Sequence, residues 1–261
     1  MNTLSTALIT GASAGIGYEL AKLFARDGGN LVLVARSGDK LAQLAAELER
    51  AYKIRAMVIT ADLALASGPD EVYAATQKAG IAVDVLVNNA GFGQFGFYVE
   101  TDLQEELRQI QLNIASLTHL TKLYVRQMVA RKRGRILNVA STAAFQPGPL
   151  MAVYYATKAY VLSFSGALSN ELSGTGVTVT CLCPGPTTSE FHQRAGMELS
   201  NMMKAPFMDA KSVAEIGYRA MLKGKSTVIA GRMNWLVAQS TRLAPRAWTA
   251  AVARKIQGKR Q

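Results

Sequence analysis

The chain has 261 residues, of which 49% are hydrophobic and 18% are charged, and its formal net charge is +11. This composition excludes extensive disorder, and the length suits one large α/β domain or two small ones with a sizeable core. No stretch approaches the roughly 20 apolar residues of a membrane-spanning helix. The N-terminus shows no basic region followed by an apolar one, so no secretory signal is visible and a cytoplasmic protein is expected.

Short apolar runs rich in β-branched residues alternate along the chain with longer helical patterns. The run TALIT predicts a first strand at 6–10, and a glycine-bearing turn and a helix from about Gly15 to Arg26 follow it. Further strands are expected at 30–36, 54–63, 83–91, 134–141, 176–185 and 226–231. Helical patterns cover 38–52, 70–79, 101–131 and the segment that holds Tyr154 and Lys158.

Strands this apolar are buried on both faces, which is typical of a parallel sheet covered by helices. The alternation of strand and helix implies right-handed crossovers and predicts an α/β fold with a three-layer, doubly wound parallel sheet. No linker, repeat or low-complexity stretch appears before residue 231, so residues 1–231 are expected to form one domain. Residues 232–261 are expected to be a basic helical C-terminal extension of that domain.

The first turn, TGASAGIG, lies between the first predicted strand and the first predicted helix. Glycines permit a tight turn and a close approach of the backbone to a diphosphate, and a helix N-terminus offers free N–H groups. The spacing G-x-x-x-G-x-G differs from the usual dinucleotide fingerprint, and a glycine turn can also serve packing alone. Its place after the first strand favours a dinucleotide site made by Gly11, Ser13, Ala14, Gly15, Ile16 and Gly17.

The end of the second strand, LVLVARS, bears on the choice between NAD and NADP. An NAD site usually has a carboxylate at the end of this strand that binds the adenosine ribose. Here Ala35 occupies the position where the acid is expected, and Arg36 follows it. A guanidinium can pair with a 2′-phosphate. We therefore predict that the cofactor is NADP(H); the alternative is that Arg36 is a solvated surface residue.

Five more motifs follow the glycine turn in a fixed order. They are NNAG at 88–91, Asn113 in LNIAS, Ser141 in LNVAS, Tyr154-x-x-x-Lys158, and PG at 184–185. Through this joint order the chain resembles the short-chain dehydrogenase/reductase family over roughly residues 4–231. The resemblance implies a Rossmann-type fold, oxidoreductase activity with a nicotinamide cofactor, and a homodimer or homotetramer.

The motif Y-x-x-x-K of that family selects Tyr154, rather than the adjacent Tyr155, as the catalytic acid and base. A free tyrosine has a pKa near ~10, and the ammonium of Lys158 is expected to lower it. Ser141 can donate a hydrogen bond to the substrate oxygen as negative charge grows there. By resemblance, Lys158 also binds the nicotinamide ribose and Asn113 holds a water of a proton relay; the alternative for Asn113 is a capping or kink residue.

The resemblance implies further cofactor contacts at other strand ends. For the adenine, ribose and diphosphate they are Asp62, Leu63, Asn89, Ala90 and Gly91. For the nicotinamide amide they lie in PGPTTSEF at 184–191, namely Pro184, Gly185, Thr187 and Thr188. Only the family position distinguishes the segments ADL at 61–63 and NNAG at 88–91 from ordinary strand-end turns.

Two segments with few charges, 91–99 and 142–151, are expected to border the open side of the nicotinamide. Their large apolar side chains are Phe92, Phe95, Phe97, Tyr98, Phe145, Leu150 and Met151. The segment 190–207 is expected to form a mobile lid rich in methionine, with Met197, Met202, Met203 and, just beyond, Met208. These residues favour a lipophilic aldehyde or ketone, or the matching alcohol, as substrate; the alternative is that they only pack the core and the lid.

The positive charge is concentrated at the end of the chain, because ten of the 29 basic residues and no Asp or Glu follow position 215. Pro245 can open a helix in which Trp248, Val252 and Ile256 repeat every four residues on one face. This pattern is typical of a basic amphipathic helix on an anionic membrane surface. The alternatives are a subunit interface and nucleic acid, which is disfavoured because no recognition module accompanies the charge.

Metal chemistry has no support in the sequence, because His119 and His192 have no ligand-spaced partners and Cys181 and Cys183 are predicted to be small buried residues. Within the oxidoreductase class, a 3-oxoacyl-carrier reductase is an alternative to a carbonyl reductase. A non-catalytic NADP(H)-binding protein is a third reading, and the complete Ser-Tyr-Lys motif argues against it.

Overall fold

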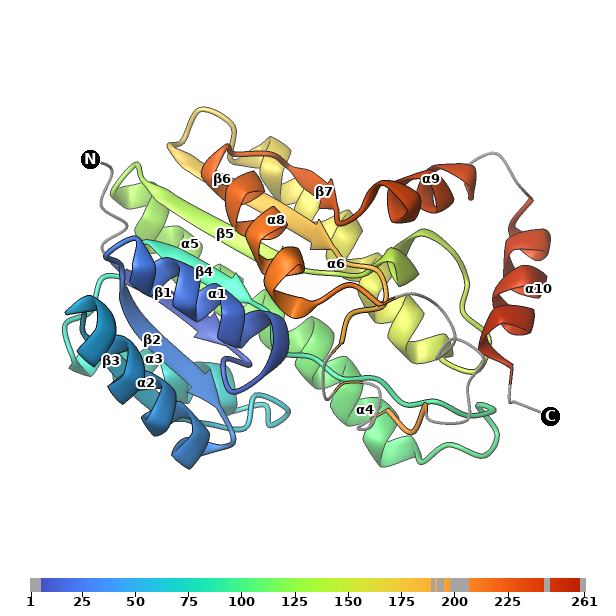
Figure 1. The fold of residues 1–261 in the computed structure, drawn as a ribbon, viewed down its shortest axis with the longest axis horizontal. Helices are drawn as coiled ribbons and strands as arrows, with labels where there is room; N and C mark the ends of the chain where they lie inside the picture. Colours follow the sequence, from blue (N-terminus) through green and yellow to red (C-terminus); the bar gives the residue numbers. More distant parts are fainter. Residues whose placement is uncertain (1–5, 189–190, 192–194, 198–206, 242–244, 259–261) are drawn as a thin grey trace.

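The computed structural model describes residues 6–188, 191, 195–197, 207–241 and 245–258. At its centre lies a parallel seven-stranded sheet in the order β3-β2-β1-β4-β5-β6-β7 (Figure 1). The strands are β1 (Thr6–Thr10), β2 (Asn30–Ala35), β3 (Ala56–Thr60), β4 (Val85–Asn88), β5 (Gly134–Val139), β6 (Val177–Cys183) and β7 (Thr227–Ile229). The predicted alternation and the parallel sheet are confirmed.

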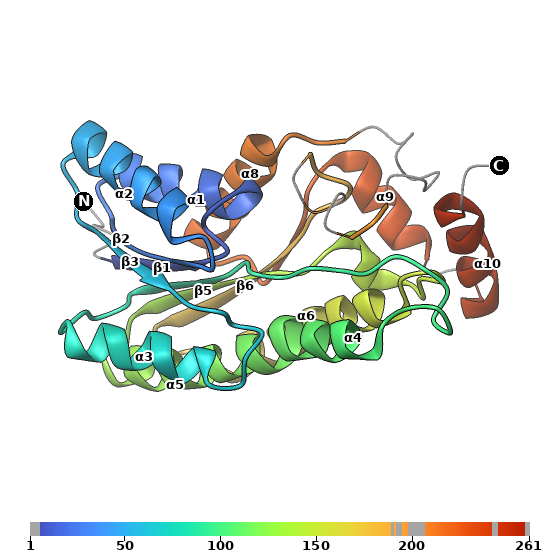
Figure 2. The ribbon, with the colours of Figure 1, turned by 90° about the horizontal axis from the view of Figure 1, so that it is seen from below.

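Helices cover both faces of the sheet, which gives the three predicted layers (Figure 2). One face carries α1 (Gly15–Arg26), α2 (Gly38–Tyr52) and α8 (Ala210–Leu222), and the other carries α3 (Gly68–Lys78), α4 (Leu103–Ile110), α5 (Leu117–Ala130) and α6 (Ala152–Glu171). Neighbouring residues of a strand point to opposite faces. Ile9 accordingly packs in the core with Phe24 of α1, and Leu8 packs in the core with Tyr124 of α5.

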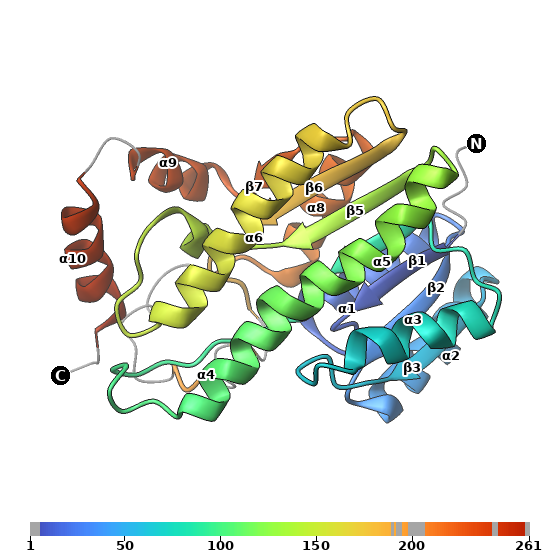
Figure 3. The same cartoon turned by 180° about the vertical axis from the view of Figure 1, so that it is seen from behind.

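The helix predicted over 101–131 contains a π-helical turn, η1 (Gln111–Ser116). The turn joins α4 to α5, which continue one another as one long helical run (Figure 3). Asn113 lies in this turn and is 1% exposed. Its side-chain Nδ2 donates to the Phe92 carbonyl at 2.9 Å and to Thr157 Oγ1 at 3.0 Å, and its Oδ1 accepts from the Phe92 N–H at 3.2 Å. Apolar periodicity does not reveal this turn, because bonds to distant segments hold it.

The C-terminal extension forms two helices, α9 (Arg232–Ser240) and α10 (Arg246–Gln257). They lie at one end of the molecule, where the segment that precedes α4 also lies (Figures 1 and 3). As predicted, α10 begins directly after Pro245. Within the described part of the chain, no helix combines the length and the apolar character needed to cross a membrane.

The topology fixes where a ligand can bind. The chain builds outward from β1 through β2 to β3 and then returns to place β4 on the other side of β1. In open parallel sheets, ligands bind outside the carboxyl ends of the strands at such a switch point. The glycine turn after β1 and the residues after β4 meet at this position.

Candidate active site

A cleft of about 530 Å³ lies along the carboxyl ends of the strands, within the range of roughly 300–1,000 Å³ that is usual for small-molecule sites. The predicted site residues that line it are Gly11, Ser13, Ala14, Gly15, Ile16, Arg36, Asp62, Leu63, Asn89, Ala90, Gly91, Ser141, Tyr154, Lys158, Pro184, Gly185 and Thr187. Gly17, Asn113 and Thr188 do not line it. Residues from seven separate segments of the sequence therefore converge on one cleft.

The turn between β1 and α1 has the properties of an anion site. Gly11 and Gly15 have φ angles of +66° and +59°, in the left-handed region that favours glycine. The helix α1 begins at Gly15, and among the described residues no side chain caps its N-terminus and no acid lies in its first turn. Free N–H groups and the positive end of the helix dipole suit a diphosphate.

Asn89 holds this turn in shape. Its side-chain amide donates to the carbonyl oxygens of Thr10 and Gly11 at 2.9 and 3.2 Å, while Thr10 Oγ1 accepts the N–H groups of Asn89 and Ala90 at 3.0 Å each. A Cβ added at Gly17 would collide with the Gly11 carbonyl and the Asn89 amide. Gly17 therefore does not line the cleft, but it allows the first helix to pack closely against the turn.

Ser141, Tyr154 and Lys158 meet at the other end of the cleft. Ser141 caps a short 3-10 turn, η2 (Thr142–Phe145), because its Oγ accepts from the Ala143 N–H at 3.1 Å. Tyr154 and Lys158 lie one helical turn apart on α6. Lys158 Nζ donates to the carbonyl of Val139 at 2.9 Å and lies 5.8 Å from the centre of the Tyr154 ring.

Burial is the largest cause of the pKa shifts of Tyr154 and Lys158. It raises the pKa of Tyr154 to about 12, against the opposing effect of a hydrogen bond with Ser141, and it lowers the pKa of Lys158 to about 8. The pKa of Tyr154 is therefore raised rather than lowered as expected, and the contribution that opposes burial comes from Ser141 and not from Lys158. Near neutral pH the phenol keeps its proton, which is the form that acts as an acid.

Tyr155 occupies a different environment from Tyr154. Its hydroxyl oxygen accepts a hydrogen bond from the side-chain amide of Gln257 on α10, and its ring lies over Gly148, where any Cβ would collide with it. The Tyr154 and Tyr155 rings pack edge to face with their centres 6.1 Å apart. Tyr155 lines the cleft, yet its hydroxyl is bound to the C-terminal helix.

Asn113 lies behind the wall of the cleft. A Cβ added at Gly91 would come within 3.0 Å of Asn113 Oδ1 and 3.5 Å of Lys158 Nζ, so the three residues adjoin. The Thr157 hydroxyl, which accepts from Asn113, donates to the Tyr154 carbonyl at 2.8 Å. Asn113 thus links the π-helical turn to the helix that carries Tyr154 and Lys158.

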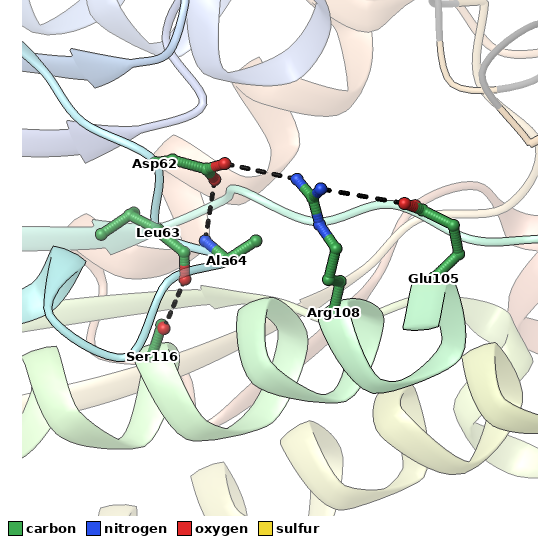
Figure 4. Close-up of polar contacts among 6 residues, drawn as sticks. All are labelled: Asp62, Leu63, Ala64, Glu105, Arg108 and Ser116. Atoms are coloured by element: carbon green, nitrogen blue, oxygen red, sulfur yellow. Dashed lines mark hydrogen bonds and ion pairs between the residues drawn. The ribbon is translucent and has the colours of Figure 1, made fainter. Parts of the chain in front are cut away.

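The end of the cleft near Arg36 contains an ion pair that the sequence does not indicate (Figure 4). Asp62, which follows β3, accepts the Ala64 N–H on Oδ1 at 2.9 Å and lies 3.3 Å from Arg108 Nη2 through Oδ2. Arg108 belongs to α4, and its Nη1 lies 3.8 Å from Glu105 Oε1. Both Arg108 and Glu105 line the cleft.

A second contact in Figure 4 fixes the loop that carries Asp62. Ser116, in the π-helical turn, donates its hydroxyl proton to the Leu63 carbonyl at 2.6 Å and is 1% exposed. The helical run from α4 to α5 therefore contacts both ends of the cleft, through Asn113 at one and through Arg108 and Ser116 at the other. No local motif predicts Arg108 or Ser116, because their partners lie 46 and 53 residues away in the sequence.

The end of the cleft near Tyr154 is mainly apolar. Its large side chains are Phe92, Met151, Tyr155, Phe191 and Met197. The Phe191 ring packs against Tyr154 with the ring centres 5.2 Å apart. Of the large apolar side chains predicted from 91–99 and 142–151, Phe92 and Met151 line the cleft, and Phe191 and Met197 come from the predicted lid.

Several residues predicted for the apolar side do not line the cleft. Phe97 and Tyr98 are 41% and 64% exposed, because the turn before α4 carries them to the surface. Phe145 packs against the apolar core cluster around Val161 and Cys181. Phe95, Leu150 and Met208 also lie outside the lining, and Met202 and Met203 are outside the described residues.

Cys181 and Cys183 are buried free thiols with their sulfur atoms 3.8 Å apart, as small core residues. Across the described ranges, no three His, Cys, Asp or Glu side chains gather as metal ligands. His119 lies 3.2 Å from Asp70 at the surface, and His192 is outside the described residues.

Residues 5–199 match the family model described as short chain dehydrogenase. Among curated proteins, the very-long-chain 3-oxoacyl-CoA reductase of Phaeosphaeria nodorum is 39% identical over 180 residues, which are 67% of this chain and 53% of that protein. The chain thus spans about half the length of this relative.

Two solved structures are similar along most of the chain. A short-chain dehydrogenase from Sphingobium yanoikuyae in complex with NADPH is 32% identical with a TM-score of 0.81, over 92% of this chain and 94% of that one. A 3-oxoacyl-[acyl-carrier protein] reductase with bound NAD from Brucella melitensis is 25% identical with a TM-score of 0.75, over 87% and 90%. Structures of this kind therefore hold either nicotinamide dinucleotide.

Proposed function

The chain belongs to the short-chain dehydrogenase family, and from this premise we propose that it interconverts a lipophilic carbonyl compound and its alcohol with NADP(H). The observation that carries the proposal is the convergence of a phenol, an ammonium and a hydroxyl, from Tyr154, Lys158 and Ser141, on the cleft that begins at the glycine turn. A protein that only bound a dinucleotide would need the turn but not this group of side chains.

The residues present fit a dinucleotide. The uncapped N-terminus of α1 and the left-handed Gly11 and Gly15 accommodate a diphosphate. Asp62, Leu63, Pro184, Gly185 and Thr187 also line the cleft, and in this proposal the first two take the adenosine end and the other three the nicotinamide end. The cleft connects both ends without interruption.

When bound, the nicotinamide ring supplies or accepts a hydride at the substrate carbon. In the reducing direction the Tyr154 hydroxyl donates its proton to the carbonyl oxygen, and Ser141 donates a hydrogen bond to the same oxygen as negative charge develops there. A preorganised donor of this kind is typically worth about 2.7–4 kcal/mol. The Lys158 ammonium stabilises the phenolate that remains on Tyr154, which takes the proton back in the oxidising direction.

The preference for NADP(H) is proposed on the residues after β2. Arg36 lines the cleft and is exposed, and none of the acidic groups in the described part of the chain forms an ion pair with it. Ala35 offers no carboxylate for a ribose hydroxyl. A guanidinium in this position can bind a 2′-phosphate with charge-assisted hydrogen bonds.

The cofactor preference is tested with Arg36→Ala. Loss of hydrogen bonds to a charged group is expected to cost about 1.5–3 kcal/mol, which weakens NADPH binding about 10- to 150-fold and leaves NADH binding nearly unchanged. Titration followed by reduced-nicotinamide fluorescence gives both dissociation constants, and the exposed Arg50→Ala serves as the matched control. A variant that kept the NADPH preference would remove Arg36 from this role.

The substrate class is proposed on the apolar side of the cleft around Phe92, Met151, Phe191 and Met197. The fungal relative is named for a ketone on a very long acyl chain, which supports a lipophilic substrate. Turnover of long-chain and ring carbonyls is expected to exceed that of small polar ketones. Faster turnover of the small polar ketones would contradict this substrate class.

The names of two similar proteins favour a second candidate, the reduction of 3-oxoacyl thioesters. The proposed acid, hydrogen-bond donor and cofactor site would serve that reaction equally, because the reacting group is again a ketone. The two candidates separate in a comparison of free long-chain ketones with 3-oxoacyl-CoA and 3-oxoacyl-carrier protein. Turnover confined to the thioesters would favour the second candidate.

A further inference from the structure

The helix α10 turns its large apolar side chains away from the protein. Trp248, Val252 and Ile256, one turn apart, are 70%, 58% and 50% exposed. The residues of α10 that are buried against the rest of the protein are instead Thr249, Ala253 and Gln257, each at most 8% exposed. A surface helix normally buries its apolar stripe against the core, so this arrangement is the reverse of the usual one.

Specific contacts hold α10 in this orientation. Gln257 donates to the hydroxyl of Tyr155, which itself lines the cleft, and the Arg254 guanidinium lies 5.9 Å from the centre of the Phe97 ring. The stripe of Trp248, Val252 and Ile256 is thus presented outward beside the apolar end of the cleft. The neighbouring α9 adds four large apolar residues that are at least 51% exposed: Met233, Trp235, Leu236 and Val237.

The charged side chains of α9 and α10 are all positive. Arg254 and Lys255 are exposed on α10, Arg232 is exposed on α9, and no Asp or Glu follows position 215 in the sequence. A second copy of this chain would bring the same charge to the contact, and like charges oppose association. An anionic lipid surface brings the opposite charge, worth about 1 kcal/mol for each nearby Lys or Arg.

We propose that α10 binds the surface of an anionic membrane, with Trp248, Val252 and Ile256 entering the boundary between headgroups and acyl chains. Arg254 and Lys255 then lie at the level of the headgroups, and the helix rests in the plane of the interface. Through Gln257 the helix contacts Tyr155 at the apolar end of the cleft, so the proposed membrane contact would lie next to that end.

The two tryptophans of the chain make a direct test possible. Trp235 and Trp248 are the only ones in the sequence, so tryptophan emission from the full chain reports on α9 and α10 alone. In the Trp235→Phe variant, vesicles of phosphatidylcholine and phosphatidylglycerol are expected to shift Trp248 emission to the blue and to co-sediment the protein. Pure phosphatidylcholine is expected to do neither, and high salt to weaken both effects.

Two double variants separate the contributions of the stripe and the charge. Val252→Ser with Ile256→Ser is expected to abolish co-sedimentation, and Arg254→Gln with Lys255→Gln to weaken it and reduce its salt dependence. The control is Leu65→Ser, which changes a side chain that is 55% exposed outside this region and is expected to bind vesicles normally. Circular dichroism of each variant confirms that it is folded.

Three results would overturn the proposal. The first is an unchanged emission spectrum and no sedimentation with anionic vesicles. The second is a blue shift that grows with protein concentration without lipid, together with a larger species in sedimentation velocity, which would assign the stripe to a second copy. The third is an equal response to polyglutamate, which would assign it to an acidic protein.

Discussion

Tyr154 and Tyr155 are neighbours on one helix, yet their hydroxyls have different partners. The Tyr154 phenol lies beside Ser141 and near Lys158, whereas the Tyr155 hydroxyl is bound by Gln257. The spacing to Lys158 places both tyrosines on neighbouring parts of the helix, so the distinction depends on their contacts with Ser141 and with α10. At the scale of single residues, chemistry therefore follows from the partner of each polar atom.

Tyr154→Phe is expected to lower turnover by at least about 10²- to 10⁴-fold, the usual contribution of a general acid, while NADPH binding is largely kept. Tyr155→Phe is expected to keep most of the activity, because its hydroxyl is engaged by α10. Steady-state kinetics with a long-chain carbonyl, together with NADPH titration, measure both effects. The opposite pattern would assign the proton transfer to Tyr155.

The burial of Lys158 makes the free energy of unfolding depend on pH. Burial lowers its pKa from 10.5 to about 8, so between these values the unfolded chain binds a proton that the folded chain has lost. Stability then rises with pH across this window. The free energy of unfolding of the wild type, relative to Lys158→Met, is expected to be constant below about pH 8 and to rise from there towards pH 10.5.

Urea unfolding of the cofactor-free protein over this pH range measures that difference. Lys122→Met, which changes an exposed lysine of α5, is the control and is expected to show no such rise. A flat difference between the wild type and Lys158→Met would show that Lys158 keeps an ordinary pKa.

Arg108 is expected to hold Asp62 in position at the adenosine end of the cleft. The ion pair is partly exposed, with 43% of the Arg108 side chain accessible, so its contribution is expected to stay within about 1 kcal/mol. Arg108→Ala should weaken NADPH binding by up to about fivefold and leave the binding of reduced nicotinamide mononucleotide, which lacks adenosine, unchanged.

A double-mutant cycle with Asp62→Asn shows whether the effect of Arg108 passes through Asp62, because coupled residues are not additive. The exposed Arg126→Ala on α5 is the matched control. Additive losses in the cycle, or equal losses for both ligands, would remove Arg108 from this role.

At the scale of elements, two helical glycines differ in whether a larger residue fits in their place. A Cβ at Gly17 in α1 would collide with the Gly11 carbonyl, whereas a Cβ at Gly166 in α6 meets nothing within 4 Å. Gly166→Ala is expected to raise the free energy of unfolding by up to about 1 kcal/mol, because alanine favours a helix over glycine. Gly17→Ala is expected to lower it and to weaken cofactor binding, since the turn must shift.

Denaturant unfolding and NADPH titration of the two variants measure these effects side by side. Destabilisation by Gly166→Ala, or unchanged cofactor binding in Gly17→Ala, would contradict the packing described for these helices.

The elements differ in how far the sequence predicts them. Apolar periodicity locates the seven strands of the sheet and the helices from α1 to α6, since each is a run with a buried face, but the predicted helices do not include α8. It does not reveal the π-helical turn at Asn113, because that turn depends on Phe92 and Thr157, 21 and 44 residues away. The apolar stripe of α10 can be predicted from the sequence. The face of α10 that packs on the rest of the protein cannot, because Gln257 binds Tyr155, which is 102 residues away in the sequence.

At the scale of the whole molecule, the parallel sheet brings the carboxyl ends of its strands to one edge, and the predicted motifs meet there for that reason. Their joint order predicts the glycine turn, Ser141, Tyr154 and Lys158 as one site through the resemblance to the family. The sequence does not predict the contacts of Arg108 with Asp62 and of Ser116 with Leu63. Phe97 and Tyr98 are predicted beside the cleft but do not line it, because their turn lies at the surface.

The most direct measurement of the central claim is isotope transfer in a single reaction. The full chain is incubated with a long-chain aldehyde or ketone and NADPH deuterated at the transferable position of the nicotinamide C4, and the products are analysed by mass spectrometry. Hydride transfer to a carbonyl predicts an alcohol that carries one deuterium on its carbinol carbon, formed with the wild type and strongly reduced with Tyr154→Phe. Tight NADPH binding without labelled alcohol from any free carbonyl or 3-oxoacyl thioester would contradict an oxidoreductase of this kind and indicate a protein that binds the dinucleotide without turnover.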